Sequence, residues 1–199
     1  MVIKELEEIL PDELKKVEKY TYLEYALLPE GAPYHLINGE LIMTPAPGIF
    51  HQIILRNLGF RMFHYVENND LGIILFAPVD VYLDKYNVLQ PDIIFINSKR
   101  SNIIKKKFIE GAPVLIVEVL SQATSKSDLT RKKDLYEKYG VKEYWIIDPD
   151  RSSIIIYNYK NSLYTQVDKK EKTGILNSTI ITGFHVELSR IFKTENNSD

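Results

Sequence analysis

The chain has 199 residues, 45% hydrophobic and 26% charged, a balance that can supply a folded core and argues against disorder over its bulk. Cysteine is absent, which excludes disulfide bonds and thiolate metal sites, so a metal ion would need oxygen or histidine ligands, a set that favours Mg or Mn. The net charge of −2 argues against nucleic acid binding over the whole surface, but residues 85–142 carry 12 Lys and Arg against 6 Asp and Glu.

The N-terminal segment is predicted to hold short helices and a hairpin. Over residues 3–19 apolar side chains recur every three or four positions, a helical period that a proline divides into two pieces. Another short helix is expected within residues 21–31. Two apolar-alternating runs flank Asn38-Gly39, which predicts a β-hairpin within residues 34–48.

The middle of the chain alternates helices and strands. Apolar residues on one helical face predict a helix over residues 51–68. Strands are expected at roughly 73–83, 90–96 and 114–120, and no conformation is predicted for the basic connection at 97–112.

A second helix follows within residues 125–140. Ser127 or Asp128 can cap its N-terminus, and Gly140 can close its C-terminus. A strand is expected at 142–148, and the remaining residues predict antiparallel strands.

This order of elements predicts an α/β (α+β) fold, with a core of mixed β-sheet flanked by helices. We expect one domain over residues 1–199, with its core at about 34–150, an N-terminal helical segment at 1–33 and extra C-terminal strands at 151–192. No apolar run approaches the roughly 18 residues that cross a bilayer, and the first residues lack the apolar stretch of a secretory signal. A cytoplasmic protein without a membrane partner is therefore expected.

Glu118 is the residue whose position most needs an explanation. It lies within VLIVEVL, an apolar run expected to be a buried strand, where an isolated carboxylate costs several kcal/mol unless it is paired, protonated or bound to metal. A strand with one exposed face is the alternative, but Ile116 and Leu120, on the same face by alternation, are apolar. A functional carboxylate is favoured.

Asp92 and Lys132 carry weaker signals. Asp92 follows a proline at the head of an apolar strand, where a turn-capping role is common. Its pairing with Glu118 strengthens a functional interpretation of Asp92, because two carboxylates at neighbouring strand ends can share a hard divalent cation. Lys132 follows Asp128 by four residues on the second helix, so a solvent-exposed ion pair is the simpler interpretation from spacing alone.

Four motifs in order resemble a known family: QPDIIFI, PVLIVEVLS, DLTRKKDLY and GVKEYWIIDP. Together with TYLEYALLPEG, INGELIMTPAPG and TGFHVELSRIF, they are similar to the Uma-type restriction endonuclease family of the PD-(D/E)xK nuclease superfamily. The resemblance covers roughly residues 20–192 and implies a restriction-endonuclease-like core.

The resemblance also implies roles for individual residues. Asp92 and Glu118 match the motif's metal-binding carboxylates, and the backbone carbonyl of Val119 would complete a site for Mg or Mn. Leu120 stands where the superfamily usually has its lysine. In this family the lysine is thought to lie on the next helix, at Lys132, with the neighbouring Lys133 as an alternative.

Further residues are implied to lie around this centre. His51 matches a family histidine that could contact a phosphate or a metal-bound water, or could make only ordinary hydrogen bonds. Glu40 is a possible additional metal ligand, and His35 and Asn38 replace residues that are more commonly acidic. Basic residues of the middle segment would contact the phosphate backbone of DNA, with a solvated basic loop as the alternative: Lys99, Arg100, Lys105, Lys106, Lys107, Arg131 and Lys133.

Two functions follow as hypotheses. The first is a metal-dependent endonuclease that hydrolyses DNA phosphodiester bonds, with a homodimer expected because cleavage of two strands commonly uses two active sites. The second is a DNA-binding or interaction module on a nuclease scaffold with weak or lost catalysis, which the missing lysine two residues after Glu118 motivates. A structural homo-oligomer is less favoured.

Overall fold

The computed structural model describes residues 18–44, 46–121 and 125–194, with the backbone alone for 125–129. Nearly all of the helical segment predicted at residues 3–19 lies outside this part of the chain. No helix among the described residues is long and apolar enough to cross a membrane.

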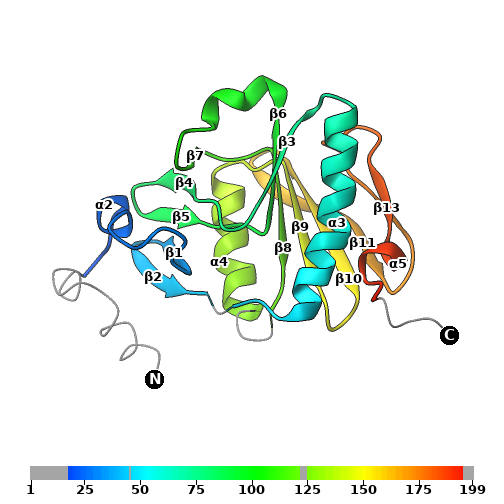
Figure 1. The fold of residues 1–199 in the computed structure, drawn as a ribbon, viewed down its shortest axis with the longest axis horizontal. Coiled ribbons are helices and arrows are strands. Elements are labelled where there is room, and N and C mark those ends of the chain that lie inside the picture. Colours follow the sequence, from blue (N-terminus) through cyan, green and yellow to red (C-terminus); the bar gives the residue numbers. More distant parts are fainter. Residues whose placement is uncertain (1–17, 45, 122–124, 195–199) are drawn as a thin grey trace.

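A six-stranded mixed sheet forms the centre of the fold (Figure 1). Only one pair of neighbouring strands in it, β8 with β9, is parallel, and the helix α4 (Ser125–Lys138) makes the crossover between them. The strands, in spatial order, are β11 (Leu163–Glu171), β10 (Ser153–Lys160), β9 (Glu143–Asp148), β8 (Leu115–Val119), β6 (Ile93–Asn97) and β3 (Gly72–Phe76).

Helices cover both faces of this sheet, α3 (Ile49–Asn68) on one and α4 on the other (Figure 1). Strand alternation explains the division, because successive side chains of a strand point to opposite faces. In β8, Leu115 and Val117 pack with Ile54 of α3, whereas Ile116 packs with Tyr136 of α4. By the same alternation Glu118 belongs to the α4 face.

A five-stranded sheet lies beside this core and brings the N-terminal hairpin to it (Figure 1). The hairpin turns at Asn38 and Gly39, with φ values of 53° and 84°, as a tight two-residue turn requires. The strands, in spatial order, are β2 (Glu40–Met43), β1 (Tyr34–Ile37), β5 (Asn87–Leu89), β4 (Val81–Asp84) and β7 (Ile109–Glu110). The short helix α2 (Tyr22–Tyr25), which Thr21 caps, packs on this sheet.

The predicted strand at 73–83 is wrong in one respect, because it is two strands that belong to different sheets. β3 pairs with β6 in the large sheet, and β4 pairs with β5 in the small one. Ala77-Pro78 lies between them, and proline has no N–H with which to continue a ladder. Residues 97–112, for which no conformation was predicted, form the 3₁₀ segment η1 (Ser98–Ile103) and the short β7.

The C-terminal residues extend the core on the side of α3 (Figure 1). β10 and β11 complete the large sheet as an antiparallel hairpin. β12 (Ile175–Asn177) and β13 (His185–Glu187) pair separately, and α5 (Leu188–Ile191) follows them. The predicted α/β class, with a mixed sheet, flanking helices, an N-terminal hairpin and C-terminal strands, is confirmed.

Candidate active site

The strand register brings Asp92 and Glu118 together at one end of the large sheet. β6 and β8 are antiparallel, with Ile93 opposite Val117. Continuing this register by one residue places Asp92 opposite Glu118, and the N–H of Val119 donates a 2.7 Å hydrogen bond to the Asp92 carboxylate. Residues 26 positions apart in the chain thus become cross-strand neighbours on one face.

Glu118 is 6% exposed, and two donors from α4 hold its carboxylate. Lys132 Nζ lies 2.9 Å from Oε2, and the Tyr136 hydroxyl donates to Oε1 at 2.6 Å. Burial raises the pKa of Glu118, and the negative charge of Asp92 adds to this, while the charge of Lys132 and both hydrogen bonds oppose it. The net direction is upward, so Glu118 in this site binds a proton more readily than a glutamate side chain exposed to water does.

The geometry of α4 separates the two adjacent lysines. Lys132 and Tyr136 are four residues apart, so both point toward β8, and both are buried. Lys133 points elsewhere: its ammonium lies 4.2 Å from the centre of the Tyr157 ring, a cation–π contact, and it is not among the described residues that line the site. The side chain of Asp128, the alternative partner predicted for Lys132, is outside the described part.

His51 closes the other side of the carboxylate pair. Its Nε2 lies 3.4 Å from Asp92 Oδ2 and 3.1 Å from the carbonyl oxygen of Val119. Burial lowers the pKa of His51, but the hydrogen bond and charge of Asp92, with smaller contributions from Val119 and Glu118, outweigh it, so the pKa is raised. Nε2 of His51 therefore contacts the two oxygens, of Asp92 and Val119, that the family resemblance implies as metal ligands. Its Nδ1 is buried and has no hydrogen-bond partner among the described residues.

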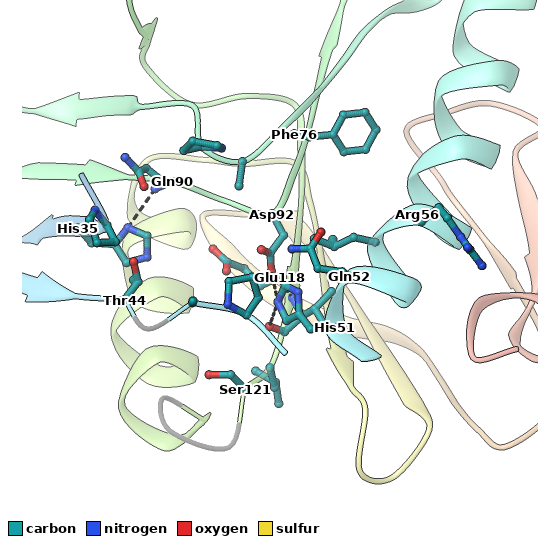
Figure 2. Close-up of a pocket in the computed structure, with 18 of the residues that line it drawn as sticks. His35, Thr44, His51, Gln52, Arg56, Phe76, Gln90, Asp92, Glu118 and Ser121 are labelled. Atoms are coloured by element: carbon teal, nitrogen blue, oxygen red, sulfur yellow. Dashed lines mark hydrogen bonds and ion pairs between the residues drawn. The ribbon is translucent and has the colours of Figure 1, made fainter. Parts of the chain in front are cut away.

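These groups line a cavity of about 740 Å³ (Figure 2). Asp92, Glu118 and His51 lie at its centre, and Lys132 also lines it. Gln52 and Arg56 reach it from α3, and His35, Thr44 and Gln90 reach it from the small sheet and the residues that follow it. The cavity therefore lies where the two sheets and α3 meet.

His35 was not singled out as functional from the sequence, although its departure from the commoner acidic residue was noted. It is 3% exposed and lines the cavity. Its Nδ1 accepts a 3.2 Å hydrogen bond from the N–H of Gln90, so the proton of the neutral ring lies on Nε2. Burial, and then the charge of Lys132, lower the pKa of His35 well below its ordinary value. This histidine is a neutral donor.

Other predicted residues are not brought to the cavity. Glu40 is exposed and forms a 2.9 Å ion pair with Arg131, and neither is among the described residues that line the cavity. The five basic residues at 99–107 follow the last residue of β6, whereas Asp92 precedes its first. They therefore lie at the opposite end of the strand from the carboxylates, and Lys105 there pairs with Glu110 at 3.1 Å.

Comparison with known proteins places this arrangement in a family. A family model described as Uma2, "Putative restriction endonuclease", matches residues 17–189, which include every group that lines the cavity. The chain belongs to the Uma2 family. The family assignment supports nuclease function for the protein.

One solved structure shows the same fold as this Uma2 chain. It is described as "a putative nuclease belonging to DUF820" from Anabaena variabilis ATCC 29413, and it has a TM-score of 0.72 with 21% sequence identity. The match covers 86% of this chain and 97% of that one. At this identity the likeness shows the fold alone. No curated protein matches the chain.

Proposed function

We propose that the protein is a metal-dependent endonuclease that hydrolyses phosphodiester bonds in DNA. The observation that carries the proposal is the buried Glu118, which shares one cavity with Asp92 and a buried lysine. A carboxylate pair and a cation at the end of a mixed sheet are an arrangement suited to stabilising charge at a phosphate. Family membership supports the same reaction class.

The donor set fits a hard divalent cation. Asp92 and Glu118 offer carboxylate oxygens, and Val119 offers its backbone carbonyl, all within reach of one cavity. Oxygen ligands of this kind suit Mg or Mn. His51 Nε2 now contacts the Asp92 carboxylate, and Lys132 Nζ contacts the Glu118 carboxylate. Among the described residues, no group of three or more acidic or histidine side chains is arranged to hold a metal ion. Cation binding therefore requires these contacts to rearrange.

Each group at the site has a separate role in the proposed hydrolysis. A bound cation would lower the pKa of a coordinated water and stabilise the charge that develops on the phosphate. Lys132 supplies a positive charge beside the phosphate, and Tyr136 orients Glu118. The neutral His35 offers an N–H donor, which suits a phosphate oxygen. Hydrolysis adds water across one P–O bond and yields a phosphate monoester and a hydroxyl.

The test is cleavage of plasmid and oligonucleotide DNA with Mg, with Mn and with chelator. Glu118→Gln and Lys132→Ala should each abolish cleavage while leaving the circular dichroism spectrum unchanged. Lys133→Ala is the matched control, because it removes the same charge one residue along the helix, where the side chain contacts Tyr157. Its cleavage rate should stay within a few-fold of wild type. Wild-type rates in Glu118→Gln, or an inactive Lys133→Ala beside an active Lys132→Ala, would contradict these roles.

The second candidate is a DNA-binding module without turnover. The specific observation in its favour is that both oxygens of Glu118 are already occupied by Lys132 and Tyr136. It predicts salt-sensitive DNA binding with no metal-dependent product on duplex, single-stranded or branched DNA. A homodimer remains a prediction that light scattering can check.

A further inference from the structure

Three phenylalanine rings extend the cavity along α3 and β3, and we call Phe60, Phe63 and Phe76 the aromatic wall. They are 65%, 42% and 41% exposed, although exposed rings of this size are costly in water. All three line the same cavity as Asp92 and Glu118. The wall is therefore continuous with the proposed catalytic centre and is not a separate patch.

Local packing holds the rings in place. Gly59 of α3 is buried, and a Cβ built at this position would lie 2.3 Å from Cε1 of Phe76, so the absence of a side chain makes room for that ring against the helix. Figure 2 shows the Phe76 ring directed toward α3. Phe60 stacks on His64 with 2° between the ring planes and 6.0 Å between centroids. Two of the three rings are thus oriented by a neighbour.

Polar side chains connect the wall to the carboxylates. Gln52, Arg56, Phe60 and Phe63 follow one another at spacings of four, four and three residues, so they share one face of α3. This stretch of helix is about 16 Å long. Gln52 and Arg56 also line the cavity, and the Arg56 guanidinium donates to Oδ1 of the adjacent Asn57. The positive charge of Arg56 suits a phosphate, and the exposed rings suit the flat face of a base.

We propose that the aromatic wall stacks unpaired bases of a DNA single strand whose scissile phosphate lies at Asp92 and Glu118. The inference rests on the proposed function and specifies its substrate class. Every base has a face that can stack on an aromatic ring, but in a duplex the neighbouring base pairs cover these faces. A second copy of the chain packed on the same rings would instead cover the cavity that holds the carboxylates, which favours the nucleic acid.

Binding in chelator tests the wall without catalysis. Fluorescence anisotropy at fixed salt would compare a labelled oligothymidine single strand with the same strand paired to oligoadenine. Wild type should bind the single strand more tightly. Phe60→Ala and Phe76→Ala should each weaken that binding about 10-fold, and Phe60→Trp, which keeps an aromatic face, should retain it. Equal affinity for both DNA forms, or no effect of the two alanine variants, would overturn the inference.

Gly59→Ala provides a sharper variant, because it keeps every ring and displaces one. The added methyl forces the Phe76 ring from its position, while alanine favours the helix more than glycine does. Single-strand affinity should fall although thermal stability does not. Leu163→Ala is the control: this apolar side chain is 64% exposed and is not among the described residues that line the cavity, so affinity should stay unchanged.

Two comparisons separate the alternatives. If light scattering shows that Phe60→Ala converts a dimer to a monomer with unchanged single-strand affinity, the wall is an interface between copies and the inference is wrong. The assay is run in chelator and follows binding alone, so it reports on the wall without metal or cleavage. A protein that discriminates single strands through the wall but never cleaves DNA would therefore contradict the proposed function alone, and cleavage that is indifferent to the wall variants would contradict the wall alone.

Discussion

At the residue scale, the charge of Glu118 is set by groups that act in opposite directions. Burial and Asp92 favour the protonated acid, and Lys132 and the Tyr136 hydroxyl favour the carboxylate. A metal ligand must be deprotonated, so the proposed activity depends on this balance. Removing one hydrogen bond should shift the pH range of activity in a definite direction.

Tyr136→Phe removes the hydrogen bond to Oε1 and keeps the ring that packs in the core. The lost bond stabilised the charged form, so the pKa of Glu118 should rise and the acidic limb of the kcat/KM profile should move to higher pH. The measurement is the cleavage rate against pH. Tyr139→Phe, one residue beyond the end of α4 and bonded to Asp84, should leave that limb in place. A Tyr136→Phe profile identical to that of wild type would disprove the assignment of this limb to Glu118.

Sequence reasoning reached some of these residues for physical reasons. An acidic residue in an apolar strand needs a partner, so Glu118 could be identified before its partners were known. The choice between Lys132 and Lys133 depends on the rotation of α4 against β8, which spacing alone does not set. His35 could not be assigned, because its burial comes from the small sheet meeting the large one.

At the scale of elements, Glu143 links the C-terminal segment to the large sheet through hydrogen bonds to Ser178 and Thr179. It is fully buried at the start of β9, and four donors converge on its carboxylate. These are the Trp145 indole N–H, the Ser178 hydroxyl, and the N–H and hydroxyl of Thr179, at distances from 2.6 to 2.8 Å. From the sequence, this glutamate was indistinguishable from an ordinary exposed charge.

Glu143→Gln should lower the free energy of unfolding by about 3 kcal/mol, because it replaces one charged acceptor oxygen with an amide that faces other donors. Chemical denaturation followed by circular dichroism measures this. Glu171→Gln, at an exposed position of β11, is the matched control and should change stability by less than about 0.5 kcal/mol. A Glu143→Gln protein as stable as the control would show that the four contacts do not act together.

Long periodic elements were predicted well, and the error at 73–83 shows where local patterns fail. The helices α3 and α4 and the hairpin turn at Asn38-Gly39 are set by local periodicity and turn chemistry. The separation of β3 from β4 depends on which strands each half finds as partners. That information lies in residues far along the chain.

At the scale of the whole molecule, the cavity exists only where two sheets and α3 meet, so ligand binding should couple to global stability. A ligand that binds the folded chain alone stabilises it by mass action. Mg or Mn at 100 times its dissociation constant should raise the free energy of unfolding by about 2.7 kcal/mol, measured by thermal denaturation. Glu118→Gln should lose this effect.

Glu40→Gln is the control for metal stabilisation, and it also tests the predicted extra ligand. Glu40 pairs with Arg131 outside the cavity lining, so this variant should keep the metal-dependent rise in melting temperature. Loss of the rise in Glu40→Gln, or its survival in Glu118→Gln, would contradict the proposed ligand set.

The direction of one strand explains why the basic segment at 99–107 was not brought to the cavity. The sequence places these residues soon after Asp92, but β6 carries the chain to the far end of the sheet before they occur.

The predicted division into one domain with a core at 34–150 stays a prediction.

The hairpin that joins β10 to β11 turns at Asn161 and Ser162, both with positive φ. Its register, with Asn158 opposite Glu143, places this turn beyond the first residue of β9, whereas Glu118 lies beside the last residues of that strand. The chain contains no cysteine, so Leu163→Cys would create a single thiol at an exposed position. A dye or surface tether attached there would leave the cavity open, which makes single-molecule recording of DNA capture feasible without redesigning the rest of the protein.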